Sequence, residues 1–421
     1  MKQTRRTVFL AVLLATAACA GDKQDSNSQP APAPADSTTT SNGSPTPPAA
    51  GAPKDAPAQI RGIYLNAYAV GSSKRLATLL KMADETEINA FVVDVKDEKG
   101  IRYHTALAHQ KQIGGEITIK DLKTLVDTIH AHKVWTMARI VVFKDPMLSK
   151  AKPEWSIKNP NGGLWQDKAG NTWVSAWDPH VWEYNIQIAE EVLKAGFDEV
   201  QFDYVRFPEP FPSLPKQVHP QAKGERVDAI ASFLSQAEPR IHALGGVMSA
   251  DLFGLSPDDP GDVNIGQQWE RLINILDHVL PMTYPSHYLA THLRGVPKPN
   301  QMPYETIVAS VGLGVIRAER LKAAGGHPAR VIPWLQAFSA PWVTRNYPYG
   351  PEQAAAQIRG VYEVGLEDWV FWHPGSKYEL VSAAFAKETA PRAKEFTPSA
   401  DLVSQVDLLE RQGVKSSRDK A

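Results

Sequence analysis

Apolar and polar positions follow two periods between Gln59 and about Lys387. Short runs rich in Val, Ile and Phe are typical of buried β-strands. Longer stretches with an apolar residue every three or four positions are typical of amphipathic helices. The predicted strands are Arg61–Tyr68, Ala90–Lys96, Val134–Val142, Glu199–Val205, Gly246–Asp251, His278–Met282, Arg330–Gln336 and Asp368–Trp372. The predicted helices include Ser73–Glu85, Ile119–His132, Val181–Ala195, Gly224–Leu244, Gln267–Leu276 and Pro351–Glu363.

This repeated order of strand and helix predicts an α/β fold in which crossover helices join parallel strands. Eight such units in one continuous region fit a (β/α)8 TIM barrel. The alternative is a doubly wound open sheet. No predicted strand is followed by a G-x-G-x-x-G or G-x-x-x-x-G-K-[ST] loop, which favours the barrel over a nucleotide-binding sheet.

Both ends of the chain differ in composition from the predicted barrel. Residues 1–19 begin with Lys2, Arg5 and Arg6, and continue with an apolar stretch too short to span a bilayer, as in an export signal. The next segment is rich in Pro, Ala, Ser and Thr, which predicts a disordered tether. We therefore expect a signal at 1–19, a tether at 20–58, the barrel at 59–387 and a polar tail at 388–421. The tail contains a possible helix at 399–412.

The only cysteine, Cys19, follows the small residues Thr16-Ala17-Ala18. This pattern resembles a bacterial lipoprotein signal, in which the Cys is lipidated, although Leu usually stands where Thr16 is. The alternative is an ordinary signal peptide cut after an A-x-A-like site, with Cys19 incidental. We expect an exported protein that is lipid-anchored at the cell envelope through Cys19, with a periplasmic or secreted protein as the alternative.

The charge and cysteine content exclude several classes of protein. The chain has 45 Lys and Arg against 46 Asp and Glu, a net charge of −1, which argues against nucleic acid as a partner. A single Cys rules out an intramolecular disulfide framework and a Cys-based zinc site. No His/Cys/Glu cluster has metal-ligand spacing, and His130 and His132 do not face each other on a helix. We expect neither a metal nor a cofactor.

Polar side chains recur where the predicted strands end. Side chains alternate along a strand, and barrel active sites lie at the C-terminal ends of the strands, so inward-facing residues there are candidate site residues. Asp203 and Asp251 end adjacent strands on the same predicted face, and Asp94 shares a face with Lys96, with Asp97 just beyond. The candidate substrate-binding residues are Tyr64, Asn66, Asp94, Asp97, Arg139, Gln201, Arg206, Tyr284, Trp334, Gln336 and Trp372.

Carboxylates together with aromatic rings suit a carbohydrate ligand. Cleavage of a glycosidic bond uses two carboxyl groups, one that protonates the leaving oxygen and one that acts as nucleophile or base. Aromatic rings stack on the apolar faces of sugars. We therefore expect Asp203 and Asp251 to form the catalytic pair, with Trp334 and Trp372 facing a sugar.

Structural alternatives exist for these acids and for a cluster of tryptophans. Asp203 alternatively forms a salt bridge with Arg206, and Asp94 and Asp97 alternatively pair with Lys96, Lys99 or Arg139. Asp178 precedes Pro179 and is expected to cap a helix. The long connection from about 144 to 179 carries Trp155, Trp165, Trp173 and Trp177. These form either a sugar-stacking rim or a small core of their own.

Six blocks of the sequence carry a family resemblance. They are "VDVKDEKG", "MARIVVFKDP", "GFDEVQFDYVRFP", "PMTYPSHY", "PWLQAF" and "WVFWHPGSKY". In this order they resemble the putative glycoside hydrolase domains of bacterial exported proteins, over about Ile60 to Tyr378. The resemblance implies a carbohydrate-active TIM barrel, with the catalytic carboxylate at Asp203 and further acids at Asp94 and Asp97. In the last block, His373-Pro374 stands where Asn-Pro is expected.

A remoter similarity to chitinase-like barrels concerns the reaction mechanism. Met282-Thr283-Tyr284 matches their Met-x-Tyr motif, but Val205 stands where their acid Glu would be. This departure disfavours substrate-assisted chitinase chemistry. It also motivates a second hypothesis, a barrel that binds glycan without cleaving it. Deacetylase or esterase chemistry ranks lower, because its metal triad or Ser elbow is missing. The sugar, the linkage, the stereochemical outcome and the acid that partners Asp203 stay open at this point.

Overall fold

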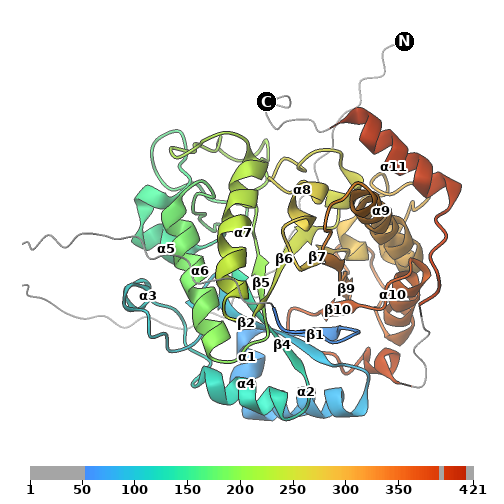
Figure 1. Ribbon diagram of the computed structural model, residues 1–421, viewed down its shortest axis with the longest axis horizontal. Helices are drawn as coiled ribbons and strands as arrows, with labels where there is room; N and C mark the ends of the chain where they lie inside the picture. The colour runs from blue at the N-terminus through green and yellow to red at the C-terminus, as the bar shows by residue number, and fades with distance from the viewer. Residues whose placement is uncertain (1–52, 388–392, 414–421) are drawn as a thin grey trace, which may run out of the picture.

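The computed structural model describes residues 53–387 and 393–413, and within them eight parallel strands close into a barrel (Figure 1). Closure follows because the first strand pairs with both the second and the last. The barrel strands are β1 (Arg61–Leu65), β2 (Ala90–Asp97), β4 (Trp135–Val141), β5 (Glu199–Asp203), β6 (Val247–Phe253), β7 (His278–Met282), β8 (Arg330–Val331) with β9 (Trp334–Gln336), and β10 (Trp369–Trp372). The TIM-barrel prediction is confirmed.

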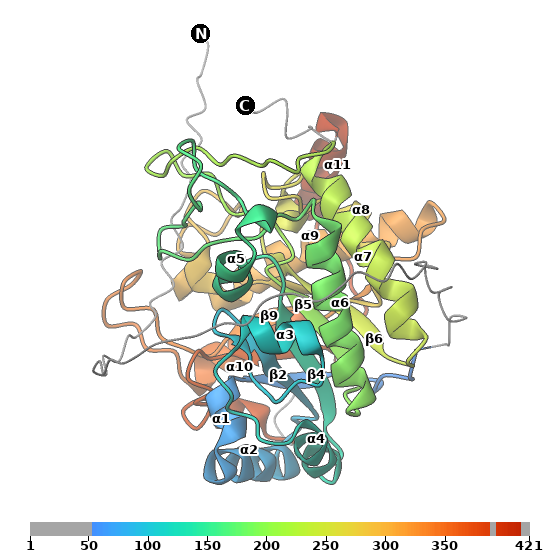
Figure 2. The same ribbon diagram turned by 90° about the vertical axis from the view of Figure 1, so that its left-hand side faces the viewer.

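Helices cover the outside of the barrel, and Figure 2 shows α6 and α7 packed side by side in front of the strands. They are α1 (Ala67–Gly71), α2 (Ser73–Glu85), α3 (Ala108–Ile113), α4 (Leu122–His130), α5 (Pro146–Ala151), α6 (Pro179–Lys194), α7 (Arg226–His242), α8 (Trp269–Ile273), α9 (Pro303–Ala323), α10 (Pro351–Glu363) and α11 (Ala400–Gln412). Asp178 caps α6 as expected, with its side chain accepting from the backbone N–H of His180.

Three differences from the predicted elements have local causes. The first strand ends at Leu65 because the side chain of Asn66 caps α1. The seventh barrel strand is interrupted between β8 and β9 at Pro333, which has no N–H for the ladder. The sequence patterns missed α9, whose interior holds Gly312 and Gly314, residues that disfavour helix. A Cβ on Gly314 would lie only 3.0 Å from the ring of Trp269, so close packing accounts for this glycine.

The strands divide their side chains between two cores. Outward-facing residues such as Phe91, Val93 and Phe202 are buried against the helices. Inward-facing residues fill the barrel, namely Tyr64, Val92, Met137, Leu280, Ile332, Trp334 and Val370. At the N-terminal end of the barrel, buried Glu199 accepts from the indole N–H of Trp135 (3.0 Å) and pairs with His278 (3.0 Å). Polar inward residues therefore lie at both ends of the barrel, with apolar layers between them.

The tryptophan-rich connection between β4 and α6 packs onto the main core that surrounds the barrel. Trp165, Trp173 and Trp177 are buried, and only Trp155 is partly exposed, stacked on His180 at 5.1 Å. The indole N–H of Trp165 donates to the carbonyl of Pro215 (2.8 Å), which joins this connection to the one after β5. Most of these rings therefore pack the loops together and have little surface left for a ligand.

The segments that flank the barrel meet it at defined places. Lys54 donates hydrogen bonds to the carboxylate of Asp198 and to the carbonyl of Gly245. Arg330 donates to the carbonyls of Pro57 and Ala58. These contacts lie at the end of the barrel where the strands begin. The predicted C-terminal helix is present as α11, which packs on α9. The signal at 1–19, Cys19 and most of the tether lie outside the described residues. In the part of the chain that is described, no helix has the length and apolarity to cross a membrane.

Candidate active site

Polar and aromatic side chains converge inside the C-terminal end of the barrel. Register explains the convergence, because Asp94 pairs with Arg139 across β2 and β4, and Arg139 pairs with Gln201 across β4 and β5. Neighbouring strands add further inward-facing residues. The cluster comprises Tyr64, Asp94, Arg139, Gln201, Asp203, Asp251, Tyr284, Trp334 and Trp372, all of them candidates from strand parity.

Arg139 is the central charge of the cluster. Its guanidinium donates from Nη1 to Oδ1 of Asp94 (2.5 Å), and from Nε to Oδ2 of Asp203 (2.9 Å). Nε also lies 4.0 Å from Oδ2 of Asp251. Although burial opposes the charge, the nearby carboxylates raise the pKa of Arg139 well above its ordinary value. The arginine is therefore a fixed cation shared by acids from three strands.

Asp251 is the most enclosed acid of the cluster, with 1 % of its surface exposed. Its Oδ1 accepts from Nε2 of Gln201 (3.0 Å) and from the indole N–H of Trp334 (2.6 Å). Burial raises the pKa of Asp251 well above its usual range, and both the charge of Asp203 and a hydrogen bond with it act in the same direction. The enclosed site and the neighbouring charge therefore favour the protonated form of Asp251.

Asp203 closes β5 and is 6 % exposed. Its Oδ2 accepts from Arg139, and its Oδ1 accepts from the backbone N–H of Tyr204 (2.5 Å). Tyr204 has a φ of 49°, a left-handed conformation that is uncommon for a bulky residue. This backbone conformation directs the N–H at the carboxylate. The salt bridge considered between Asp203 and Arg206 does not form, since Arg206 faces Glu209 at 3.7 Å and covers the ring of Phe253.

A bulge in β2 changes which of its residues face inward. The pairing with β4 shifts register between Asp94 and Lys96, so Lys96 turns outward and forms a buried ion pair with Asp145 (2.8 Å). The expectation that Asp94 and Lys96 share a face was therefore wrong. Asp94 accepts from the hydroxyl of Tyr64 and from Arg139. Burial and the charge of Asp94 raise the pKa of Asp97 to about 6.

Trp372 supplies the partly exposed aromatic surface of the cluster. Its ring contacts Tyr284 (5.4 Å between centroids), Tyr64 (6.3 Å) and Phe338 (5.1 Å). Trp334 was expected to face a sugar, but it is only 2 % exposed. Its indole N–H holds Asp251 instead, so the ring supports the acid and leaves almost no face for stacking.

Two other candidates have structural partners for their polar atoms. Gln336 accepts from the N–H of Ser286 (2.9 Å) and donates to the carbonyl of Phe338 (2.8 Å), so its amide fixes two loops. Asn66 caps α1 and donates to the carbonyl of Pro374 (2.9 Å). Neither amide is directed at the carboxylates.

Sequence patterns missed several residues beside the cluster. Lys144 donates to Glu98 (2.9 Å) and to the hydroxyl of Tyr204 (3.3 Å). Burial opposes ionisation of Glu98, but the charge of Lys144 outweighs it and lowers the pKa. Phe338 and His287 border Tyr284. These residues lie on loops after the strands, where strand parity gives no signal.

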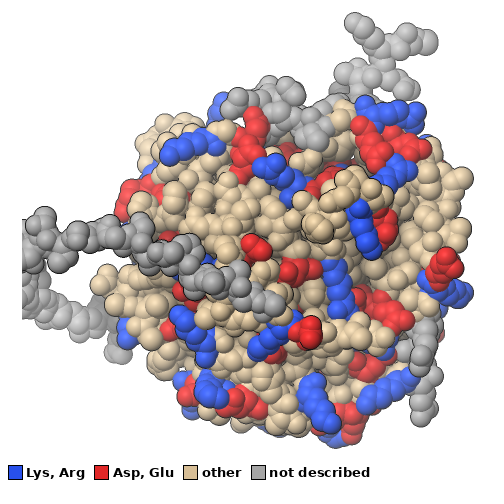
Figure 3. All heavy atoms as spheres, in the orientation of Figure 1, with Lys and Arg blue, Asp and Glu red and all other residues tan. Residues whose placement is uncertain are grey.

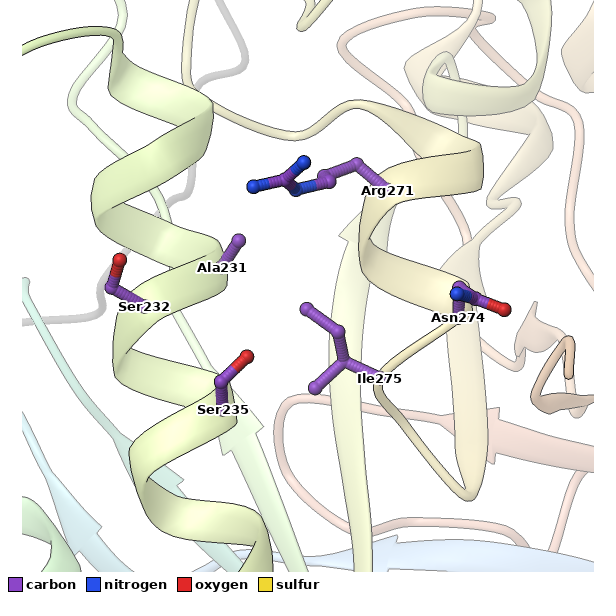
Figure 4. A pocket seen from close by; sticks show the side chains of 6 residues that line it. All are labelled: Ala231, Ser232, Ser235, Arg271, Asn274 and Ile275. Carbon is purple, nitrogen blue, oxygen red and sulfur yellow. The ribbon is translucent and has the colours of Figure 1, made fainter. Parts of the chain in front are cut away.

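Two cavities lie apart from the carboxylates. One of about 390 Å³ at the mouth of the barrel is lined by Asn66, Tyr68, Ala69, Arg75, Gly375, Lys377 and Glu379. The other, of about 340 Å³, lies on the outer wall between α7 and α8, where Ser235 and Arg271 point toward it (Figure 4). Arg271 faces Asp228 there at 3.4 Å.

On the face shown in Figure 3, Lys and Arg are interspersed with Asp and Glu.

The hydrogen bond from Trp334 predicts a measurable property of Asp251. The indole N–H favours the ionised carboxyl, so Trp334→Phe, which removes this donor, should raise the pKa of Asp251 further. Carbon-13 NMR titration of the carboxyl groups measures this shift. Trp269→Phe is the matched control, because the indole N–H of Trp269 is buried without a hydrogen-bond partner. An unchanged Asp251 titration in Trp334→Phe would contradict the proposed support.

Comparison with known proteins gives one family and several similar folds. The family model described as "Putative glycosyl hydrolase domain" matches residues 62–378. A hypothetical protein from Ruminiclostridium thermocellum is 36% identical, with 45% of this chain and 97% of that chain covered and a TM-score of 0.41. No curated protein matches the chain.

Two more distant structures share the barrel fold. The glycoside hydrolase domain of PgaB (BpsB) from Bordetella bronchiseptica is 14% identical, with 78% of this chain and 99% of that chain covered and a TM-score of 0.54. Alpha-L-fucosidase isoenzyme 2 from Paenibacillus thiaminolyticus is 16% identical, with 78% of this chain and 48% of that chain covered and a TM-score of 0.50. This chain therefore spans about half the length of that fucosidase.

Proposed function

Because this chain belongs to the family of putative glycosyl hydrolase domains, we propose that it hydrolyses glycosidic bonds in a poly- or oligosaccharide. The observation that carries the proposal is the convergence of Asp203 and Asp251 on Arg139, whose Nε lies 2.9 Å from Oδ2 of Asp203 and 4.0 Å from Oδ2 of Asp251. Two neighbouring carboxyl groups are what acid-assisted cleavage of an acetal requires. Trp372 offers an aromatic surface beside the pair.

In this proposal Asp203 acts on the anomeric carbon. Its carboxylate attacks that carbon or stabilises the positive charge that develops there, while Arg139 and the N–H of Tyr204 fix its orientation. The leaving oxygen needs a proton from a second carboxyl. Burial raises the pKa of Asp251, which favours its protonated form, and the N–H groups of Gln201 and Trp334 hold its Oδ1 in a fixed position.

The position of Asp251 makes a second carboxyl group a candidate for the proton donor. Both acids lie within 4.0 Å of the same guanidinium nitrogen, and Asp251 is almost fully enclosed, whereas a proton donor must reach the glycosidic oxygen. Asp97 is the alternative acid, because it is more exposed than Asp251 and its pKa of about 6 suits proton donation near neutral pH. Asp251 then tunes Asp203 instead of contacting the sugar.

The test is hydrolysis of a panel of bacterial envelope and exopolysaccharide glycans by the wild-type protein. We expect new reducing ends, and proton NMR of the first product gives its anomeric configuration. Loss of the true acid should slow substrates with poor leaving groups more than aryl glycosides with good ones. Asp97→Asn and Asp251→Asn compared in this way identify the donor. Absence of turnover on every glycan would contradict the proposal.

A glycan-binding barrel without hydrolysis is the second candidate. The burial of Asp251 favours it, because a carboxyl that is only 1 % exposed offers almost no surface to a sugar oxygen. Binding on a glycan array with no product release, and with unchanged affinity in Asp251→Asn, would support this candidate. Any measured turnover would remove it.

We also propose that the protein is exported and anchored to the cell envelope through a lipid on Cys19. The charged start, the apolar stretch and the small residues before Cys19 support this. Residues 54–58 contact the barrel at its N-terminal end, on the side opposite the acids. Labelled palmitate should be incorporated into the wild-type protein and not into Cys19→Ala. Equal labelling of both would contradict the anchor.

A further inference from the structure

An exposed apolar patch lies on the loop between β9 and α10, at the mouth of the barrel. The side chains of Trp342 and Val343 are 56 % and 47 % exposed. A tryptophan this exposed leaves a large apolar ring in water, and such patches often mark binding surfaces. The loop follows the C-terminal end of a barrel strand, where the ligands of this fold bind.

The turn that carries Trp342 is anchored to the barrel. The N–H groups of Val343 and Thr344 both donate to the carbonyl of Ala340 (3.0 Å each), and Ala340 is buried. Further along the loop, the N–H of Tyr349 donates to the hydroxyl of Ser339 (3.0 Å). The loop is therefore held at both ends, and the turn presents the indole ring outward at a fixed place.

The buried ring of Phe338 joins Trp342 to the aromatic residues of the acid cluster. The Trp342 ring stacks on Phe338, with 6.3 Å between centroids and 11° between planes. Phe338 contacts Trp372 (5.1 Å) and Tyr284 (6.2 Å), and the charge of Asp251 acts on the hydroxyl of Tyr284. Trp342 therefore lies one ring beyond the partly exposed Trp372, so a ligand long enough to extend past Trp372 can reach it.

We propose that Trp342 is the stacking platform of an outer sugar subsite, so that the preferred ligand is a chain of sugars and not a single glycoside. This inference rests on the proposed glycan-acting function. Continuity with Trp372 favours a glycan over a second copy of this chain as the occupant. The apolar face of a pyranose ring covers the indole, while its hydroxyl groups stay in water.

The experiment uses an array of oligosaccharides of two to eight units from bacterial and plant polysaccharides, followed by calorimetry on each ligand that binds. Trp342→Ala should weaken binding of the longest oligosaccharides about tenfold, with a loss that shrinks as the chain shortens. Trp342→Phe should restore most of the affinity. Leu244→Ala removes a comparably exposed apolar side chain at the opposite end of the barrel and should change nothing.

The outcomes separate this inference from the function on which it rests. If Trp342→Ala binds oligosaccharides of every length with the wild-type affinity, the outer subsite is overturned, but the proposed glycan-acting function is not. A loss that is equal for short and long ligands also overturns the subsite. If Trp342→Ala instead abolishes self-association, the patch is a contact surface for a second copy of this chain, and the subsite is overturned. No glycan binding by the wild-type protein overturns both proposals.

Discussion

Asp203→Asn is expected to lower kcat by about 10⁴-fold or more on the glycan that the wild-type protein hydrolyses. The amide keeps the shape of the side chain, but its single oxygen can accept from only one of the two donors, Arg139 or the N–H of Tyr204. It carries no charge with which to stabilise the developing positive charge on the sugar. KM should change far less than kcat, because the lost interaction forms mainly in the transition state.

The variant also has a second readout that does not depend on turnover. The charge of Asp203 raises the pKa of Asp251, so Asp203→Asn should lower that pKa. Asp178→Asn is the matched control, because Asp178 is equally buried but caps α6, where Asn caps as well as Asp. Retained hydrolysis in Asp203→Asn would remove Asp203 from the reaction, and equal losses in both variants would indicate a folding defect.

Strand parity was enough to predict where most of the site lies. Alternation of side chains placed Asp94, Arg139, Gln201, Asp203 and Asp251 inside the barrel, and their hydrogen bonds link them there. Parity is local, because it depends only on the period of two along a strand. The barrel itself was predictable because each strand run alternates with a helical pattern.

The remaining features of the site depend on contacts between distant residues, which a local sequence pattern does not predict. The bulge in β2 lies where its pairing with β4 shifts register. As a result Lys96 faces outward, and Asp97 lies beside Asp94 on the inner face. Trp334 points inward as parity predicts, but its depth in the barrel makes it a partner of Asp251 and not a surface for sugar. The left-handed backbone at Tyr204 has no sequence signal, because glycine does not occupy that position.

Arg139→Met is expected to cost about 3–5 kcal/mol of unfolding free energy at neutral pH. The substitution keeps much of the apolar volume but removes the cation that faces Asp94, Asp203 and Asp251. These acids are buried at the same place, so their charges are left without compensation. Burial already raises the pKa of Asp94 while Arg139 is present, and loss of the arginine should raise it further.

The sign of the pH dependence follows from this raised pKa. An acid that binds its proton more tightly in the folded state makes folding more favourable as the pH falls through the folded-state pKa. The stability deficit of Arg139→Met should therefore shrink on acidification, and urea unfolding at neutral and mildly acidic pH measures it. Arg240→Met is the control, since Arg240 pairs with Glu183 and Glu190 at the outer surface, and this substitution should cost about 1 kcal/mol or less of unfolding free energy.

Adding Asp94→Asn to Arg139→Met should recover part of the lost stability, because it removes one of the uncompensated charges. A deficit that is independent of pH would mean that Arg139 stabilises the barrel through packing and not through its charge.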